Sequence, residues 1–308
     1  MIKIIKNRKF FLPISALLVT ASIVALFIWG LNFGIDFKGG SLLEVEFGGE
    51  FRPTISEVQD SLAGAGLFNS IVQPTEDSYI IRFKESDETI HFSAVESLKS
   101  LAENNEGASF KELRFDSVGP SIGKELKQKS FNASFIALIM IIVYISFSFR
   151  KVSLPVASWK YGVASSIALA HDVLITLGVF SFLGNFYGTE VNTPFIAAIL
   201  TILGYSINDS IVVFDRIRDN LPKSKDNFSD TVDKSLNQTL GRSLNTSFST
   251  ILALLAIYFF GGDTIKDFAL ALVIGISVGT FSSIFIASPI LVIWDNLSRA
   301  KRKASLEK

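Results

Sequence analysis

Six long apolar stretches constrain the fold of this chain more than any other feature of its sequence. A helix needs roughly 20 mostly apolar residues to cross a hydrocarbon layer of about 30 Å. The stretches that meet this requirement lie at residues 10–31, 131–149, 161–183, 193–214, 244–260 and 268–294. The first is too long for the apolar core of a signal peptide, so we interpret it as an uncleaved anchor. The sequence predicts a polytopic α-helical membrane protein with six transmembrane helices.

Lysine and arginine residues gather on one side of these spans. Short cytoplasmic loops of membrane proteins carry an excess of both residue types, whereas large domains cross the membrane largely regardless of charge. The basic side holds the N-terminus, a loop with Arg150, Lys151 and Lys160, the loop at 216–225 and the tail at 297–308. We therefore expect both termini in the cytoplasm and the long segment between the first two spans on the outer side.

The segment between the first two spans is too polar to enter lipid, and it predicts a separate domain. Residues 41–47 alternate between apolar and polar, which is typical of a half-buried strand, and shorter runs typical of strands lie at 70–73, 79–83 and 109–115. A helix at 54–66 begins with Thr54 and Glu57 at the spacing of a capping box. A second helical pattern places its apolar residues on one face, at Phe92, Val95, Leu98 and Leu101. The order βαββαβ is that of the ferredoxin-like α+β fold.

The predicted chain therefore has four parts. A cytoplasmic N-terminus and the first transmembrane helix occupy residues 1–31, and the ferredoxin-like outward domain occupies residues 32–128. Transmembrane helices two to six follow at 129–296, and a basic cytoplasmic tail ends the chain at 297–308.

No pattern in the sequence predicts an enzyme, a metal site or a protein that binds nucleic acid. His91 is the lone histidine of the outward domain, and we expect it to be a solvated helix residue. The chain has no cysteine, which excludes disulfides and thiolate metal sites, and it has no Walker A sequence. Its 29 basic and 29 acidic residues balance, which argues against a nucleic-acid partner. We expect no cofactor, and an outward domain that binds or moves.

Ionisable side chains inside the predicted spans are the main candidates for function. At the centre of a span, such a residue costs at least about 2.5–3.5 kcal/mol. His171 and Asp172 lie in the third span, Asp209 lies in the fourth, and Arg242 opens the fifth. A carboxylate beside a guanidinium in a low dielectric can gain and lose charge as its partner moves. We predict that these four side chains belong to a proton relay.

Two structural interpretations stand beside this one. Polar side chains also hold membrane helices together, and Asp209 and Arg242 are then a buried ion pair. Arg242 also lies near the cytoplasmic end of its span, where a long cationic side chain can extend to the interface. In the sixth span, small residues recur at every fourth position around Gly275 and Gly279, which predicts close packing against another helix.

Several motifs resemble those of the SecD and SecF subunits of the bacterial Sec protein translocase. The run GIDFKGGS at 34–41 resembles the opening motif of both subunits. Further runs are similar to SecF, namely VGPSIG at 118–123, AHD at 170–172, GYSINDSIVVFDR at 204–216, QTLGR at 238–242, NTS at 245–247 and FGG at 260–262. The motif residues that we single out are Gly34, Asp36, Gly39, Gly40, Asn208, Asp215 and Arg216. The single, modest outward domain fits SecF better than SecD.

The resemblance implies a fold and a function. A SecF-like chain forms the six-span half of a transporter of the resistance–nodulation–division (RND) type in the bacterial inner membrane, with a periplasmic domain and a SecD-like partner. It assists the SecYEG channel in the export of preproteins, with YajC and YidC as further partners and the proton gradient as the energy source. In this family an aspartate in the fourth span and an arginine at the start of the fifth are implicated in proton movement. They match Asp209 and Arg242; Asp172 also matches a motif position.

Two other functions are compatible with the predicted topology. An RND-type exporter of small molecules or lipids usually carries both halves in one chain, and efflux by this chain alone would favour that function. A non-conducting scaffold subunit would need Asp209 for assembly but not for function once assembled.

Overall fold

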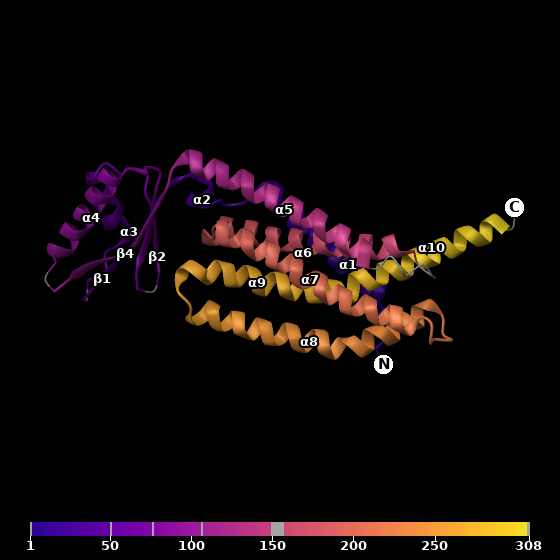
Figure 1. The fold of residues 1–308 in the computed structure, drawn as a ribbon. Helices are drawn as coiled ribbons and strands as arrows, with labels where there is room; N and C mark the ends of the chain where they lie inside the picture. Colours follow the sequence, from indigo (N-terminus) through magenta and orange to yellow (C-terminus); the bar gives the residue numbers. More distant parts are fainter. Residues whose placement is uncertain (1, 50, 76, 106, 149–156, 307–308) are drawn as a thin grey trace. The chain divides into compact units, whose positions relative to one another are not determined.

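The computed structural model describes residues 2–49, 51–75, 77–105, 107–148 and 157–306 (Figure 1). Two compact units make up the chain. One consists of Met1–Asn32 with Asn132–Lys308, and the other is Phe33–Phe131. Arg150 and Lys151, which contribute to the predicted orientation, lie outside the described residues.

The larger unit is a bundle of membrane-length helices. In the described part of the chain, six helices are long and apolar enough to cross a membrane, which confirms the predicted class. The elements are α1 (Arg8–Ile28), α5 (Pro120–Ser148), α6 (Ser158–Tyr187), α7 (Thr193–Asn220), α8 (Phe228–Phe260), α9 (Asp263–Ser282), the π-helix η1 (Ser283–Ala287) and α10 (Ser288–Leu306). The last three follow one another without a break and form the sixth span.

Burial separates the helices at the centre of the bundle from those at its surface. Half of the spans in α6 and α7 and more of the sixth span is buried, whereas only 6% of the span in α5 is buried. The exposed side chains of α5 are large and apolar, among them Phe131, Phe135, Ile139, Met140 and Val143. Such a surface is suited to contact with lipid tails, because exposing this much apolar area to water is unfavourable.

The fifth span begins earlier than its hydropathy predicts. Helix α8 starts at Phe228 rather than at residue 244, with the side chain of Asn227 accepting a hydrogen bond from the Asp230 amide. Its first turns are rich in polar residues, so they carry no membrane signal. Their apolar face is nevertheless buried, since Phe228 and Val232 belong to the same core cluster as Ile4 and Ile5 of the N-terminal segment.

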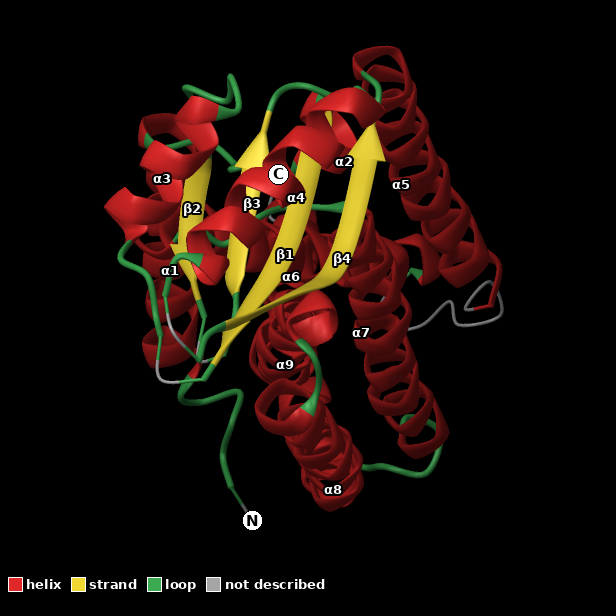
Figure 2. Cartoon of the chain, turned by 90° about the vertical axis from the view of Figure 1, so that its left-hand side faces the viewer, coloured by secondary structure: helices red, strands yellow, loops and turns green. Residues whose placement is uncertain are grey.

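The smaller unit has the predicted ferredoxin-like fold. Its elements are α2 (Ile35–Lys38), β1 (Gly40–Gly48), α3 (Ile55–Gly64), β2 (Ile71–Pro74), β3 (Tyr79–Phe83), α4 (Glu88–Glu103) and β4 (Ser109–Val118). The antiparallel sheet has the order β2-β3-β1-β4, and α3 and α4 cover one of its faces (Figure 2). Leu43, Ile81, Leu62 and Leu98 are fully buried between sheet and helices.

The capping box at the start of α3 is present. Thr54 Oγ1 accepts a hydrogen bond from the Glu57 amide, and Glu57 Oε2 accepts one from the Thr54 amide at 2.7 Å. The backbone amide and the hydroxyl of Thr54 both donate to the carboxylate, and they hold the pKa of Glu57 below its usual value.

Two details of the expectations for α4 are wrong. Leu98 is fully buried and Val95 and Leu101 pack against the core as predicted, but Phe92 is 64% exposed, and Ala94 and Ala102 complete the buried face. His91 is not solvated either. Its Nε2 lies 3.0 Å from Glu112 Oε1, and its ring stacks on Phe115 with centroids 3.8 Å apart. Both partners come from β4, which the local helical pattern around residue 91 does not reveal.

Candidate functional site

Asp209 lies inside the fourth membrane helix with an unusual hydrogen-bond arrangement. Its side chain points from α7 toward α8, and the residue is only 6% exposed. The hydroxyl of Ser243 on α8 donates a hydrogen bond to Oδ1. The other oxygen, Oδ2, is buried and has no hydrogen-bond partner among the residues that the structure describes. Such a buried oxygen is costly unless water or another donor reaches it.

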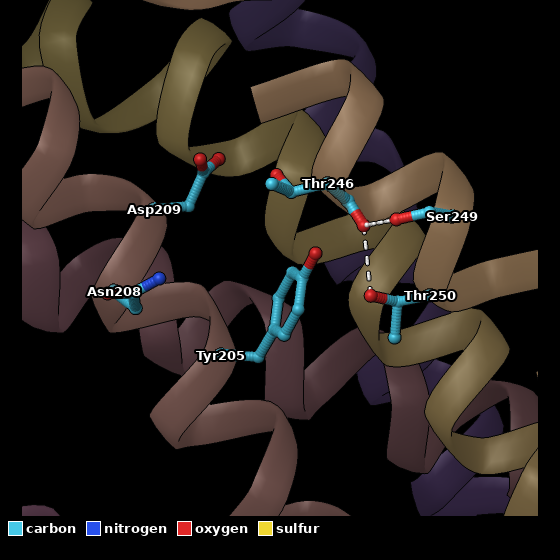
Figure 3. Close-up of a pocket in the computed structure, with 6 residues that line it drawn as sticks. All are labelled: Tyr205, Asn208, Asp209, Thr246, Ser249 and Thr250. Atoms are coloured by element: carbon cyan, nitrogen blue, oxygen red, sulfur yellow. Dashed lines mark hydrogen bonds between the residues drawn. The ribbon is translucent and has the colours of Figure 1, made fainter. Parts of the chain in front are cut away.

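A cavity of about 260 Å³ adjoins this carboxyl group. It is lined by Tyr205, Asn208 and Asp209 from α7, and by Thr246, Ser249 and Thr250 from α8 (Figure 3). Asn208, Thr246 and Ser249 are exposed, so the cavity opens at the surface of the helix bundle. One water takes about 30 Å³ in the liquid, so the cavity can hold several. The arrangement is a carboxyl group at the inner wall of a polar, hydratable space.

Arg242 does not pair with Asp209. It is exposed, and it forms no ion pair with any described residue. Ser243, the next residue of α8, faces α7 instead. Consecutive positions on a helix are turned by about 100°, so the two side chains cannot share one face. The structure therefore separates these two predicted relay residues, and it does not contain their buried ion pair.

Asp172 and His171 form a second, closed cluster. Asp172 on α6 is fully buried, and its Oδ2 accepts hydrogen bonds from Ser206 Oγ at 2.6 Å and Ser282 Oγ at 2.8 Å. His171 Nδ1 lies 3.0 Å from Oδ1 of the same carboxyl group. His171 Nε2 is buried without a partner in the described chain. Neither residue lines the cavity beside Asp209.

The polar residues near the end of α7 make contacts within that helix and with α8. Asp215 forms an ion pair with Arg218 on the same helix. Arg216 Nε donates to Gln238 Oε1 on α8 at 2.7 Å, and Asn220 Nδ2 donates to the same oxygen at 2.8 Å. Neither Asp215 nor Arg216 lines the cavity, whereas Asn208 does.

The glycine motif at residues 34–41 lies at the start of the ferredoxin-like domain and packs closely against other parts of it. Gly34 precedes α2, and its carbonyl accepts from two amides of that short helix, which also contains the half-buried Asp36. Gly39 and Gly40 have φ of +77° and +123°. A Cβ on Gly39 would lie 2.8 Å from Pro120 Cα, and one on Gly40 would lie 2.6 Å from the Phe83 carbonyl oxygen. Only glycine fits both the conformation and the space.

Gly275 and Gly279 bring α9 close to α7. A Cβ on Gly275 would lie 2.1 Å from Ile202 Cδ1, and one on Gly279 would lie 3.1 Å from Ser206 Cβ. The same added atom on Gly279 would lie 3.4 Å from Asp172 Oδ2. The small residues therefore allow the hydroxyl groups of the sixth span to reach Asp172.

Sequence reasoning missed the partners of both carboxyl groups. Ser243 belongs to a stripe with Thr239 and Ser247, at every fourth position of α8, and all three are buried. That spacing indicates a polar face on α8. The neighbouring stripe around Thr246 is equally polar, so the sequence does not show which of the two faces α7. Ser206 and Ser282 carry no signal at all, because they meet Asp172 only through tertiary packing. Among the described residues, no group of three His, Asp or Glu side chains is placed to hold a metal ion.

Comparisons with known proteins agree with this architecture. A family model described as protein export membrane protein SecD/SecF, C-terminal, matches residues 97–297, and one described as the SecD/SecF GG motif matches residues 24–49. Protein translocase subunit SecF of Thermobaculum terrenum is 41% identical, covering 96% of this chain and 95% of the relative. SecF of Synechocystis sp. is 39% identical, covering 91% of this chain and 90% of the relative.

A solved structure supports the same relationship. The chain resembles a crystal structure of SecDF, a translocon-associated membrane protein from Thermus thermophilus, with a TM-score of 0.80 and 34% identity over 95% of this chain. It spans 38% of the length of that SecDF chain. The fold defines a multi-pass membrane protein with six membrane-length helices and a ferredoxin-like domain. The chain belongs to the SecD/SecF family of protein export membrane proteins, and within it to the SecF subunits of the protein translocase.

Proposed function

We propose that this SecF subunit couples proton movement through the membrane to the export of preproteins. One observation carries the proposal. Asp209 has an unsatisfied buried oxygen next to a hydratable cavity in the middle of a membrane helix. A carboxyl group in that position can exchange a proton with water, and Ser243 can follow the change because a hydroxyl group is both a donor and an acceptor. Ionisable residues inside membrane helices commonly form such relays.

The exposed polar face of α7 and α8 supports a membrane partner. Asn208, Arg242, Thr246 and Ser249 are exposed at positions inside or next to the spans. Lipid is a poor solvent for these groups, so another subunit must cover them. We propose a SecD-like chain as that subunit, with Arg242 facing a carboxyl group of the partner. The solved SecDF chain supports this choice, since it is much longer than the present chain.

The rest of the proposed assembly follows from the family and from the charge distribution. Both termini lie in the cytoplasm and the ferredoxin-like domain lies in the periplasm, where it acts on preproteins as they leave the SecYEG channel. YajC and YidC are proposed as further partners, and the proton gradient replaces any nucleotide or cofactor. The basic loops and tail support the orientation.

The test is the export of a preprotein into membrane vesicles with and without a proton gradient. Asp209→Asn keeps the size of the side chain and its acceptor for Ser243, but it cannot exchange a proton. We expect it to abolish gradient-stimulated export, by at least about tenfold, while insertion and co-purification with a SecD-like chain stay normal. Arg242→Ala is expected to give the same loss.

Asp219→Asn is the matched control, because this residue lies on the same helix but is exposed near its end. The proposal is wrong if correctly inserted Asp209→Asn exports as well as the parent protein. A loss of co-purification with normal export of the assembled fraction would indicate the scaffold function instead.

A further inference from the structure

A chain of buried hydroxyl groups connects Asp172 to the helix turn that carries Asp209. Ser206 and Ser282 donate to Asp172 from α7 and α9. The Oγ of Ser283, the next residue of the sixth span, lies 3.1 Å from Ser210 Oγ and 3.3 Å from the Ser206 carbonyl oxygen on α7, and 2.9 Å from the Gly279 carbonyl oxygen of its own span. Ser210 directly follows Asp209 in α7. All four serines are at most 1% exposed.

The π-helix η1 begins at the same place. It covers Ser283–Ala287, directly after the serine that donates to Asp172. Single turns of π-helix inside α-helices are frequent at functional sites. Here two hydroxyl contacts flank the start of the π-helix, one from Ser282 to α6 and one from Ser283 to α7.

We propose that Asp172 is a positioning residue, which fixes η1 against the turn of α7 between Ser206 and Ser210 and thereby sets the position of Asp209. This inference rests on the proposed function, because it gives Asp172 a role in placing the proton-carrying group. It reassigns Asp172 and His171 from the predicted relay to the frame that holds the relay.

The contacts of Asp172 favour positioning over proton transfer. Both of its oxygens are engaged, one by two hydroxyl groups and the other by His171. The residue is fully buried and does not line the cavity beside Asp209. Its partners come from three separate stretches of helix, so the carboxyl group joins α6, α7 and α9 at one point.

Two substitutions separate the roles. Asp172→Asn removes the charge but retains a carbonyl oxygen for the two serines, and its amide can donate to His171 in the matching tautomer. Asp172→Ala removes every contact of the carboxyl group. We expect Asp172→Asn to keep gradient-stimulated export within about twofold of the parent protein, and Asp172→Ala to lower it about tenfold or more.

A disulfide reporter measures the position of η1 directly. The chain has no cysteine, so the pair Ser210→Cys and Ser283→Cys can be introduced alone, at hydroxyl groups 3.1 Å apart. A disulfide requires sulfur atoms about 2.05 Å apart, so only a well-placed η1 gives efficient cross-linking. We expect full cross-linking with Asp172 or Asn at position 172, and a severalfold lower yield with Ala. The pair Ser247→Cys and Thr280→Cys joins α8 and α9 one turn earlier and should cross-link in all three backgrounds.

Each outcome either supports or overturns the proposal. The proposal is overturned if Asp172→Asn loses export as Asp172→Ala does while its cross-link remains, since the carboxyl group would then carry the proton. It is also overturned if Asp172→Ala retains the cross-link. Should Asp172→Ala fail to accumulate, Ser282→Ala decides, because it removes one contact and must lower the cross-link yield. The cross-link needs no proton gradient, so it tests positioning separately from the Asp209→Asn test of the proposed function.

Discussion

Ser243 on α8 donates a hydrogen bond to one oxygen of Asp209 on α7, while the second oxygen of the same carboxyl group meets no donor in the described chain. The pair therefore joins two helices through a group that is only half satisfied. Any change in the charge of Asp209 alters this contact first. In the proposed function, this contact is where protonation of Asp209 acts on the packing of α7 against α8.

Removal of the Ser243 hydroxyl tests this contact. Ser243→Ala leaves Asp209 in place but without its hydrogen bond, and a hydrogen bond to a charged group is worth about 1.5–3 kcal/mol. We expect gradient-stimulated export to fall about tenfold in vesicles, with normal insertion. Ser249→Ala is the control, because Ser249 lines the same cavity but donates only to Thr246 of its own helix. Equal export by the two variants would contradict the role of Ser243.

The second glycine of the GG motif is expected to be indispensable for the outward domain. Gly40→Ala places a methyl group 2.6 Å from the Phe83 carbonyl oxygen at a positive φ, which should cost about 1–3 kcal/mol. Limited proteolysis of the full protein in detergent should show faster cleavage between residues 41 and 118. Gly64→Ala, in α3 with open space around it, should cause no such loss. Unchanged protease resistance of Gly40→Ala would show that the backbone adapts.

The contact between α9 and α7 predicts a compensating pair. Gly275→Leu forces a large side chain into Ile202, and overpacking of this kind costs about 1–3 kcal/mol. The tryptophans Trp29, Trp159 and Trp294 all belong to the helical unit, so their fluorescence reports its thermal unfolding in detergent. We expect a lower Tm for Gly275→Leu and partial recovery when Ile202→Ala is added. A double variant less stable than either single one would exclude direct contact.

The capping box of α3 predicts a pH dependence of domain stability. The folded-state pKa of Glu57 is below its unfolded value of 4.5, so its contribution is complete above about pH 4.5 and is lost as the pH falls through the folded-state pKa. Thr54→Ala removes the hydroxyl cap and should lower the Tm of the domain by a few degrees at pH 7. The difference between variant and parent should shrink toward pH 3. A difference that is constant from pH 7 to pH 3 would rule out the linkage.

Local patterns in the sequence were sufficient for most of the fold. The capping box, the alternating strand at 41–47 and the six apolar stretches each depend on neighbours in the chain, and each is found where it is predicted. The early start of α8 was missed because its first turns are rich in polar residues, and their apolar face packs on Ile4 and Ile5, residues far away in the sequence.

The candidate site was less predictable, for a geometric reason. Asp209 and Arg242 are recognisable as charges inside spans, but which way each points depends on helix rotation, and Arg242 turns outward. Asp172 meets Ser206 and Ser282 from two other helices. Serines are frequent in membrane helices for packing alone, so nothing local marks these two.

The close contact of Gly39 with Pro120 and Gly123 has one more consequence. It joins the two places at which the chain enters and leaves the ferredoxin-like domain, since a Cβ on Gly123 would lie only 3.0 Å from the Gly39 amide nitrogen. A domain whose entry and exit meet at one point can be exchanged as a unit. Residues 33–131 of one SecF could therefore be exchanged for those of another without redesign of the membrane helices.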